Sequence, residues 1–449
     1  MIGAGQAGPS LTGRLAAAGM SVALIERHLI GGTCVNTGCT PTKTLVASAQ
    51  VAHQARRARE YGIKLDGSVA VDMTAVKARK DAVIGASRIN LEKWLQEMER
   101  CTLFREHARF ESPHELRVGE DILEAERIFI NVGGRAVIPN MPGIDTIPYL
   151  TNSSILDLEV LPRHLIVVGG SYIGLEFAQM YRRFGSEVTV IEKGPRLIGR
   201  EDPDVSSAIA EIFANEGIAV RMDAECITFE RRKQDIAAGV SCASGEPEVL
   251  GSHALLAVGR RPNTDDLGIE NAGIKLDQHG YIVVDDQLRT NVPGIWAMGD
   301  CNGKGAFTHT AYNDFEIIAQ NLLDGRERRV SERIPCYALF IDPPLGRVGM
   351  TETEARARNH RIRVGTRPMT RVARAREKGE TQGFMKVVVD ARSNEILGAA
   401  ILGVGGDEAV HCIIDTMSAK APFTTLRDTV HIHPTVAELI PTVLGELKP

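Results

Sequence analysis

The chain has 449 residues, which is enough for about two to four domains with sizeable hydrophobic cores. The formal net charge of −5 gives no indication of a nucleic-acid or anionic-membrane partner, and no apolar run approaches the roughly 18 residues that a membrane-spanning helix needs. The chain contains eight cysteines, and no basic segment followed by an apolar one stands at its start, so we expect a cytoplasmic protein without a signal peptide.

The first recognisable motif is a glycine fingerprint near residue 1. Gly3, Gly5 and Gly8 open a predicted helix, an apolar strand follows over residues 21–25, and Glu26 ends that strand. Glycines at these positions allow a pyrophosphate to approach the helix N-terminus, and an acid about 20 residues later accepts hydrogen bonds from ribose hydroxyls. The order of turn, helix, strand and acid therefore predicts a dinucleotide site.

The strand that should precede this fingerprint is almost missing. Such a strand lies in the centre of a parallel sheet, is apolar on both faces and needs about five residues, yet only Met1 and Ile2 precede Gly3. We therefore expect a truncated or mis-started reading frame, with a working protein that begins several residues earlier.

Two cysteines follow in a glycine-rich segment, residues 31–43, with the sequence GGTCVNTGCTPTK. The CxxxxC spacing of Cys34 and Cys39 is typical of neither zinc sites nor thioredoxin-like sites, which use CxxC. On a continuous helix, five positions correspond to about 500° of rotation, so a bond between the two sulfurs would require a distorted first turn. A strained disulfide is easily reduced, and a helix N-terminus stabilises the resulting thiolate. The segment thus indicates a catalytic disulfide, with a pair of unlinked buried thiols as the alternative.

A second fingerprint follows a predicted strand over residues 165–169. It contains Gly169 and Gly174, continues as a helix, and leads to a second strand that ends in Glu192. This spacing predicts a second dinucleotide site, with a Rossmann domain that binds no nucleotide as the alternative. Because Glu192 accepts hydrogen bonds from a ribose diol but repels a 2′-phosphate, we expect NADH rather than NADPH. Glu176, which we place in the first turn of the intervening helix, interacts favourably with the helix dipole.

The character of the sequence changes near residue 334, where strand-like and helical segments indicate a separate α+β domain. The segment HIHPTVAE at residues 431–438 closes this domain. Its spacing allows Glu438 to orient the imidazole of His433, as a general acid or base requires. A purely local interpretation is also open, in which Thr435 and Glu438 form a capping box and His433 is a surface residue.

Residues 31–43 strongly resemble the redox-active motif of the class I pyridine nucleotide–disulfide oxidoreductases, a family that includes dihydrolipoamide dehydrogenase, glutathione reductase and mercuric reductase. The resemblance implies a redox-active Cys34–Cys39 disulfide, with Cys39 against the flavin, Cys34 attacking the substrate and Lys43 near the flavin ring. Segments similar to other motifs of the family follow in the family's order along the chain, at residues 128–135, 255–263, 294–300 and 431–438.

The resemblance also implies the fold class, an α/β protein with two Rossmann-like dinucleotide-binding domains, for FAD and NAD(P), plus a C-terminal α+β dimerisation domain. We expect the first part of the FAD-binding domain, with its truncated strand, at residues 1–147 and the NAD(P)-binding domain at 148–265. The second part of the FAD-binding domain is expected at 266–332 and the dimerisation domain at 333–449. The expected assembly is a homodimer whose active site draws His433 from the second subunit.

FAD is expected at the first fingerprint and NAD at the second, with NADP less favoured, and Glu176 is then an expected partner of Lys43. We expect no resident metal site. The expected catalytic residues are Cys34, Cys39, His433 and Glu438. The family's motifs assign cofactor binding to Gly3, Gly5, Gly8, Glu26, Thr33, Lys43, Gly133, Gly169, Gly174, Glu176, Glu192, Gly259, Asp300 and His309.

The expected function is that of a FAD-dependent NAD(P)H:disulfide oxidoreductase, in which hydride passes from NADH through FAD to the cysteine disulfide and on to a disulfide or similar oxidised substrate. The HIHPTVAE segment looks most like dihydrolipoamide dehydrogenase. Residues 40–43 and 307–314 look closer to the mercuric-reductase-like and reactive-chlorine-resistance flavoproteins, so a metal ion is the alternative substrate. A non-catalytic nucleotide-binding or assembly protein is a further alternative, but it would not need Cys34, Cys39 and His433.

Overall fold

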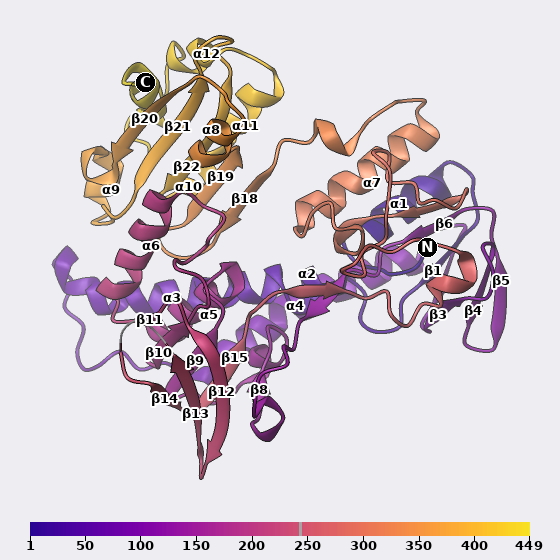
Figure 1. Cartoon of the computed structure of the whole chain (residues 1–449), viewed down its shortest axis with the longest axis horizontal. Coiled ribbons are helices and arrows are strands. Elements are labelled where there is room, and N and C mark those ends of the chain that lie inside the picture. Colours follow the sequence, from indigo (N-terminus) through magenta and orange to yellow (C-terminus); the bar gives the residue numbers. More distant parts are fainter. Residues whose placement is uncertain (242–244) are drawn as a thin grey trace.

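The computed structural model describes residues 1–241 and 245–449, and Figure 1 shows that these residues form three lobes. The start of the chain lies in one lobe, the segment around the second fingerprint in another, and the C-terminal domain forms the third. The α/β class with two Rossmann-like units and a C-terminal α+β domain is confirmed.

The N-terminal lobe combines a parallel sheet with flanking helices and a three-stranded antiparallel sheet, β3-β4-β5. β1 pairs with β2, and β6 with β17, in parallel, while Ile2 forms parallel bridges to both Ile25 and Ile130. Ile2 therefore occupies the position between β1 and β6. The elements of residues 1–147 are α1 (Ala7–Ala17), β1 (Val22–Ile25), α2 (Gly32–Asn36), α3 (Cys39–Arg57), α4 (Met73–Gln96), β2 (Cys101–Phe104), β3 (Ala108–Phe110), β4 (Glu115–Val118), β5 (Asp121–Glu124), β6 (Ile128–Ile130) and β7 (Gly134–Ala136), and β17 (Ile295–Ala297) and α7 (Thr308–Leu323) join them later in the chain.

The hydrophobic core of this lobe combines residues from the start of the chain with residues from α7, about 300 positions later. In α1, Leu11 and Leu15 lie one turn apart and are both buried, which gives the helix an apolar face. α1 packs against α7, whose Ile317 and Ile318 belong to the same core. The late segment that carries β17 and α7 is therefore required to complete the first dinucleotide unit.

The second lobe is a parallel sheet in the order β11-β10-β9-β15-β8, with a separate antiparallel sheet β12-β13-β14. β9 reads HLIVV, and its last four residues are buried because the strand is covered on both faces. The elements are β8 (Tyr149–Leu150), β9 (His164–Val168), α5 (Tyr172–Phe184), β10 (Glu187–Ile191), α6 (Pro203–Asn215), β11 (Ala219–Arg221), β12 (Glu225–Arg232), β13 (Asp235–Ser241), β14 (Glu248–Gly251), β15 (His253–Leu256) and β16 (Arg260–Pro262).

The C-terminal domain is built on an antiparallel sheet in the order β18-β19-β22-β21-β20. Its central strand β22 reads ILGAAIL and is buried throughout, since helices and neighbouring strands cover it. The elements are β18 (Cys336–Leu339), β19 (Leu345–Gly349), α8 (Glu352–Ala357), β20 (Ile362–Pro368), α9 (Ala373–Glu377), β21 (Phe384–Asp390), β22 (Ile396–Leu402), α10 (Gly406–Ala409), α11 (His411–Ser418), α12 (Phe423–Arg427) and α13 (Ile440–Gly445).

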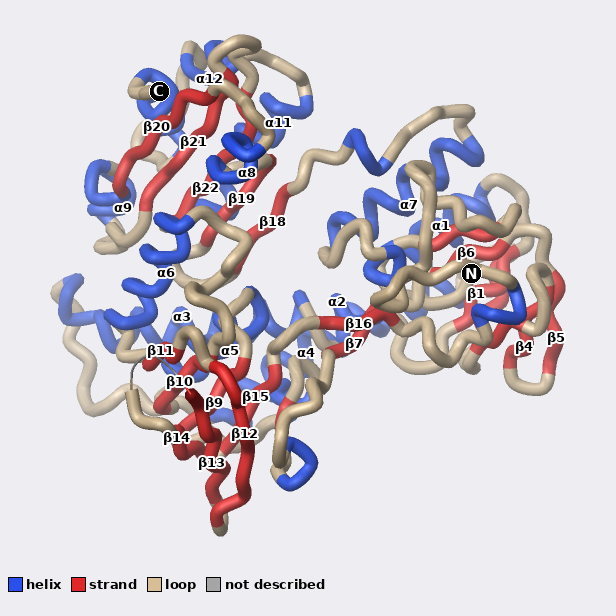
Figure 2. The backbone as a smooth tube through the Cα atoms, in the orientation of Figure 1, coloured by secondary structure: helices blue, strands red, loops and turns tan. Residues whose placement is uncertain are grey.

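Two connections fix the N-terminal lobe to the second lobe. The first is the packing of α3 on α5, in which Leu45 and Ala49 of α3 share a hydrophobic core with Leu175 and Phe177 of α5. The second is the antiparallel pair β7-β16, which lies in the connection between the lobes in Figure 2. Because α3 begins at Cys39, the first connection also places the redox segment between the two nucleotide units.

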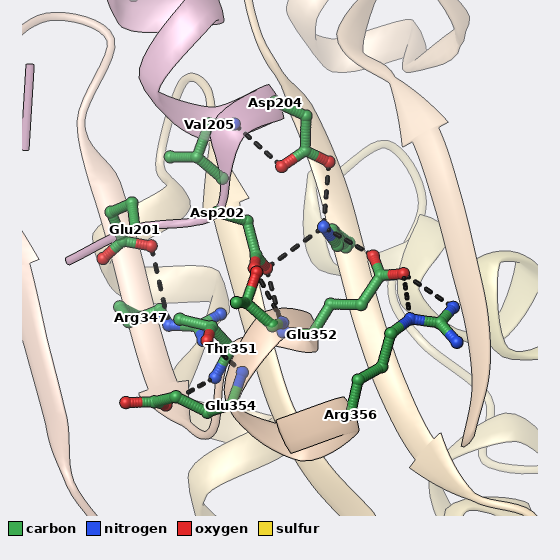
Figure 3. A network of polar contacts seen from close by, with 11 residues as sticks. Glu201, Asp202, Asp204, Val205, Arg347, Thr351, Glu352, Glu354 and Arg356 are labelled. Atoms are coloured by element: carbon green, nitrogen blue, oxygen red, sulfur yellow. Dashed lines mark hydrogen bonds and ion pairs between the residues drawn. The ribbon is translucent and has the colours of Figure 1, made fainter. Parts of the chain in front are cut away.

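A buried polar network fixes the second lobe to the C-terminal domain. The Lys386 ammonium group, which is almost fully buried, lies 3.1 Å from Asp202, 2.9 Å from Asp204 and 2.9 Å from Glu352. Figure 3 labels these three acidic residues. Asp202 also accepts hydrogen bonds from the backbone N–H groups of Glu352 and Thr353, both at 2.9 Å, at the start of α8. A carboxylate of the second lobe thus supplies the acceptor that the first turn of a helix in the C-terminal domain requires.

Candidate active site

A cavity of about 970 Å³ runs between the lobes, near the upper end of the volumes typical of small-molecule sites. Eleven of the residues proposed from the sequence line it: Gly3, Gly5, Glu26, Thr33, Cys34, Cys39, Lys43, Gly133, Glu176, Asp300 and His309. The structure does not place the other proposed residues on its wall, namely Gly8, Gly169, Gly174, Glu192, Gly259, His433 and Glu438. The predicted FAD motifs and the redox motif therefore converge on one space.

The first fingerprint forms a cradle at one end of the cavity. A Cβ atom on Gly8 would lie 2.2 Å from the backbone oxygen of Gly3, so a side chain at position 8 would close the turn. The Glu26 carboxylate accepts one hydrogen bond from the N–H of Ala4 and one from that of His28, each at 2.9 Å. These bonds hold Glu26 at the end of β1, where a ribose would approach.

The rest of this wall suits a flavin dinucleotide. Burial raises the pKa of Asp300, whose carboxylate lies 3.4 Å from the Arg260 guanidinium. His309 is stacked on Phe307 with 5.3 Å between ring centroids, and its Nε2 donates to the carbonyl oxygen of Cys336 at 2.7 Å. Burial lowers the pKa of His309 and keeps the ring neutral. An open glycine cradle, an acid for hydroxyl groups and a flat aromatic wall fit FAD.

The two cysteines lie on different helices, and the helix is interrupted between them, as a close approach of the two sulfurs requires. Cys34 lies within α2, Thr37 and Gly38 interrupt the helix, and Cys39 is the first residue of α3. At Gly38 the backbone leaves the helical conformation (φ −137°, ψ −114°). This interruption allows the Cys34 thiol to hydrogen-bond to the Cys39 sulfur although the residues are five positions apart.

The surroundings of Cys39 favour its thiolate form. The pKa of Cys39 is lowered to about 6 by a hydrogen bond from the Cys34 thiol, by another from the Thr308 hydroxyl at 3.1 Å, and by the positive charge of Lys43. The position of Cys39 at the start of α3 adds the favourable end of the helix dipole. The same hydrogen bond and burial raise the pKa of Cys34. The pair therefore holds one proton on Cys34 and a negative charge on Cys39.

Lys43 lies one turn after Cys39 and forms an ion pair with Glu176 at 2.5 Å. Its ammonium group also lies 4.5 Å from the centre of the Phe340 ring, and Glu176 accepts the backbone N–H of Phe340 at 3.0 Å. The expected Lys43–Glu176 contact is confirmed. The placement of Glu176 in the first turn is wrong, because α5 begins at Tyr172 and Glu176 is its fifth residue, where the helix dipole has little effect.

The second fingerprint has the geometry of a nucleotide turn. A Cβ atom on Gly174 would lie 2.0 Å from the backbone oxygen of Gly169, so only glycine allows α5 to approach β9 so closely. The Glu192 carboxylate accepts hydrogen bonds from the N–H groups of Gly170 at 2.6 Å and Gly194 at 2.7 Å. Glu192 is thus fixed beside the turn, at the carboxyl end of β10.

The HIHPTVAE segment shows the predicted His433–Glu438 contact but only one of the two hydrogen bonds of a capping box. His433 Nδ1 lies 2.8 Å from Glu438, and the N–H of Glu438 donates to the Thr435 hydroxyl at 3.3 Å. His433 nevertheless remains 74% exposed and lies off the cavity that holds the cysteines. Val430 and Ile432 beside it are 96% and 80% exposed.

Several site residues have no signal in the sequence. The contact of Thr308 with Cys39 and the ring of Phe340 under Lys43 both join segments about 270 to 300 positions apart, so no local spacing could reveal them. In the part of the chain that the structure describes, no helix is long and apolar enough to cross a membrane.

The chain matches the family model for pyridine nucleotide-disulphide oxidoreductases over residues 1–314 and the model for the dimerisation domain of these enzymes over residues 336–444. It therefore belongs to the pyridine nucleotide–disulphide oxidoreductase family, and it is a FAD-dependent flavoprotein oxidoreductase that uses a pyridine nucleotide.

Its relatives span the substrates considered above. The chain is 36% identical to the probable pyridine nucleotide-disulfide oxidoreductase RclA of Escherichia coli (strain K12), with 100% of this chain and 98% of that protein covered. It is 33% identical to a mercuric reductase of Streptomyces lividans, with 94% and 90% covered, and 30% identical to a dihydrolipoyl dehydrogenase of Chlamydia muridarum, with 98% and 94% covered. The solved structure of the HOCl-induced flavoprotein disulfide reductase RclA from Escherichia coli covers 99% of this chain and 98% of its own, with a TM-score of 0.90 and 36% identity, and its Cu(II) complex has a TM-score of 0.88.

The environment of Cys39 gives a testable pH dependence. In the reduced protein with Cys34→Ser, whose hydroxyl still donates to the sulfur, we expect the thiolate absorbance of Cys39 in the ultraviolet to persist down to pH near 6, far below the value of about 8.5 for a free thiol. Thr308→Val should raise the pKa of Cys39, because it removes a hydrogen bond to the thiolate.

The control for that titration is Thr44→Val, because the Thr44 hydroxyl donates only to the Thr40 carbonyl of α3 and does not contact the sulfur. The pKa values of Cys101, Cys301, Cys336 and Cys412 are all raised by burial, so these thiols titrate in a separate, higher range. A midpoint near 8.5 before the Thr308 change would contradict the assignment.

Proposed function

We propose that this protein is an NADH-dependent disulfide reductase in which Cys34 and Cys39 form the redox-active pair. The observation that supports this most directly is the position of both sulfurs on the wall of the flavin-sized cavity, with Cys39 held as a thiolate beside Lys43 and Thr308. The chemistry that FAD supplies when bound is two-electron transfer from the reduced nicotinamide to the cysteine disulfide.

In the reduced pair, Cys34 is the attacking group, although its raised pKa means that it needs a base. His433 accepts the Cys34 proton, the Cys34 thiolate attacks one sulfur of a substrate disulfide, and the substrate S–S bond breaks. The departing thiolate takes the proton from His433. The Cys39 thiolate then attacks Cys34 in the mixed disulfide, which releases the second substrate sulfur as a thiolate and restores the Cys34–Cys39 bond. This second thiolate takes one proton from solvent. Overall, NADH, a proton and one disulfide give NAD⁺ and two thiols.

The base must come from a second subunit. Within one chain, the His433–Glu438 pair lies off the cavity, and the apolar side chains of Val430 and Ile432 beside it face outward. Exposed apolar side chains next to a catalytic pair are typical of a surface that another chain covers. The dimerisation domain that carries this segment supports a homodimer in which His433 of one subunit serves the cysteines of the other.

A metal ion is the second candidate substrate. The RclA structure is also known as a Cu(II) complex, and a mercuric reductase is among the relatives. Thiolates are preferred ligands of soft metal ions, and Cys34 and Cys39 supply two. Among residues 1–241 and 245–449 of one chain, no group of three or more His, Cys, Asp or Glu side chains could hold a metal.

The cysteine chemistry is tested with Cys39→Ser. We expect NADH oxidation with a panel of disulfides, and with Cu(II), to fall to background, whereas reduction of bound FAD by NADH persists because the nicotinamide site contains neither thiol. Turnover and flavin absorbance are measured in the same preparation, with Cys412→Ser as the control. Equal loss of both half-reactions would show that Cys39 only supports the fold.

The shared site is tested by mixing two inactive variants. A heterodimer of one Cys34→Ser subunit and one His433→Gln subunit has one complete site if each site uses both chains, so its activity should return to about half of the wild-type value. Both homodimers should be inactive. Heterodimers isolated with two different affinity tags and no recovered activity would place all catalytic groups in one chain.

Nucleotide choice is tested at Glu192. Like charges about 4 Å apart in a medium of dielectric about 20 repel by roughly 4 kcal/mol before salt screening, so we expect kcat/KM for NADH to exceed that for NADPH by at least about tenfold. Glu192→Ser should reduce this ratio. Glu187→Ser, at the other end of β10, is the matched control. A higher kcat/KM with NADPH would mean that the basic neighbours Lys193 and Arg196 decide the choice.

A further inference from the structure

Arg347 and Glu201 form a charge pair that is buried but incompletely hydrogen-bonded. Arg347 is 1% and Glu201 2% exposed, and the distance from Arg347 Nε to Glu201 Oε2 is 3.7 Å, longer than a hydrogen bond (Figure 3). Arg347 Nη2 and Glu201 Oε2 both lack any hydrogen-bond partner. Buried charged donors are normally satisfied, whereas in the part of the chain that the structure describes Nη2 has no hydrogen-bond acceptor, even beside the unpartnered Oε2 of Glu201.

The position of this guanidinium is defined by the β18-β19 pair. Arg347 on β19 lies directly opposite Tyr337 on β18, and the Tyr337 hydroxyl donates to Glu201 at 2.5 Å. Tyr337 also hydrogen-bonds to Tyr172, whose ring packs edge-on against it with 5.4 Å between centroids. Arg347, Tyr337 and Tyr172 line the same cavity as Cys39. The residue that carries the unsatisfied donor therefore belongs to a wall of the candidate active site, while Nη2 itself is buried.

Tyr172 relates this wall to the second fingerprint. It is the first residue of α5, the helix whose N-terminus receives the pyrophosphate in a Rossmann domain. Glu176, the partner of Lys43, lies four residues later on the same face of the helix. A dinucleotide held at the α5 N-terminus must pass Tyr172 to bring its nicotinamide ring to the Lys43–Glu176 pair.

The part of the dinucleotide that crosses this stretch is the nicotinamide riboside, which carries acceptors on its ribose hydroxyls and its carboxamide. We propose that Arg347 is a binding residue for the nicotinamide riboside half of NAD(H), to which Nη2 donates a hydrogen bond, while Glu201 and Tyr337 hold the guanidinium in place. This inference rests on the proposed use of NAD(H). It adds to the site a residue 155 positions downstream of Glu192 in the sequence, in the C-terminal domain.

The test compares NAD⁺ with ADP, which lacks the nicotinamide and its ribose, as ligands of the FAD-loaded full-length protein in titration calorimetry. In Arg347→Met, the Kd for NAD⁺ should rise by about 10- to 100-fold, the range for one hydrogen bond to a charged group, while the Kd for ADP stays within about twofold. Arg356→Met is the control, because Arg356 belongs to the same network but is more than half exposed and contacts Glu352 (Figure 3).

A second variant separates ligand binding from folding. Arg347→Met leaves Glu201 buried and unpaired, whereas Glu201→Gln with Arg347→Met removes both charges and should recover the melting temperature. If Arg347 binds the nucleotide, the double variant still binds NAD⁺ weakly. Recovery of NAD⁺ affinity in the double variant, or normal affinity in Arg347→Met, would overturn the inference and leave the proposed function intact. Absence of NAD⁺ binding by the wild-type protein would overturn both.

Discussion

The packing of α3 against α5 is the contact on which the site depends. α3 begins at Cys39 and carries Lys43 one turn later, and α5 carries Glu176 and the nucleotide turn at its start. Leu45 and Ala49 bury the apolar face of α3 in the core of the second lobe. The ion pair between Lys43 and Glu176 therefore joins two helices that are already held by hydrophobic packing, and its geometry is fixed at little further entropic cost. The packing of α3 on α5 therefore holds the cysteine segment at the start of α3 in a fixed position relative to the glycine turn before α5.

The same pair of helices explains why the pKa values of the two cysteines differ. The break at Thr37 and Gly38 separates α2 from α3 so that Cys34 can donate to Cys39, and it leaves Cys39 at a helix N-terminus. Hydrogen bonds from Cys34 and Thr308 and the charge of Lys43 outweigh burial and the charge of Glu176 at the Cys39 sulfur and lower its pKa. Thr308 and Lys43 act on Cys34 as well, but its hydrogen bond to Cys39 and its burial outweigh them and raise its pKa. An electrostatic asymmetry between two identical side chains is what a thiol–disulfide reaction needs, since one sulfur must leave easily while the other attacks.

The C-terminal domain contributes more than an interface. Its strand β18 supplies the carbonyl that fixes His309, and Phe340, the residue after β18, places its ring beneath Lys43. Lys386 and the N-terminus of α8 bind the acidic segment that begins α6, so the sheet is held against the second lobe through Asp202. Hydrogen bonds from Thr353 and from the α8 backbone, together with the charge of Lys386, outweigh burial and lower the pKa of Asp202 to about 2. Because this carboxylate stays ionised at neutral pH, the two units remain coupled there, and the wall formed by β18 and β19 stays in register with α5.

The sequence by itself determined the local parts of this protein. The two fingerprints, the acids that end β1 and β10, the CxxxxC segment and the His433–Glu438 spacing are all set by residues within a few turns or strands of one another, where backbone geometry is predictable. They predicted the α/β class and the two nucleotide units, and they singled out the Cys34 and Cys39 pair. The sequence did not predict that Cys34 and Cys39 lie on separate helices or that Glu176 lies beyond the first turn of α5, because helix boundaries depend on how the ends pack.

Only the tertiary structure decided which distant groups meet at the cysteines. Thr308, Phe340 and Arg347 reach the cavity from segments hundreds of residues away from Cys39, through strand pairing and the packing of α7 on α1. The spacing of these residues in the sequence does not predict that they meet at the cavity. They meet because the hydrophobic cores beside the site are formed by segments that are far apart in the chain. The tertiary structure likewise decided that the His433–Glu438 pair faces away from its own cysteines, because the C-terminal sheet fixes that segment on the outer surface of the chain.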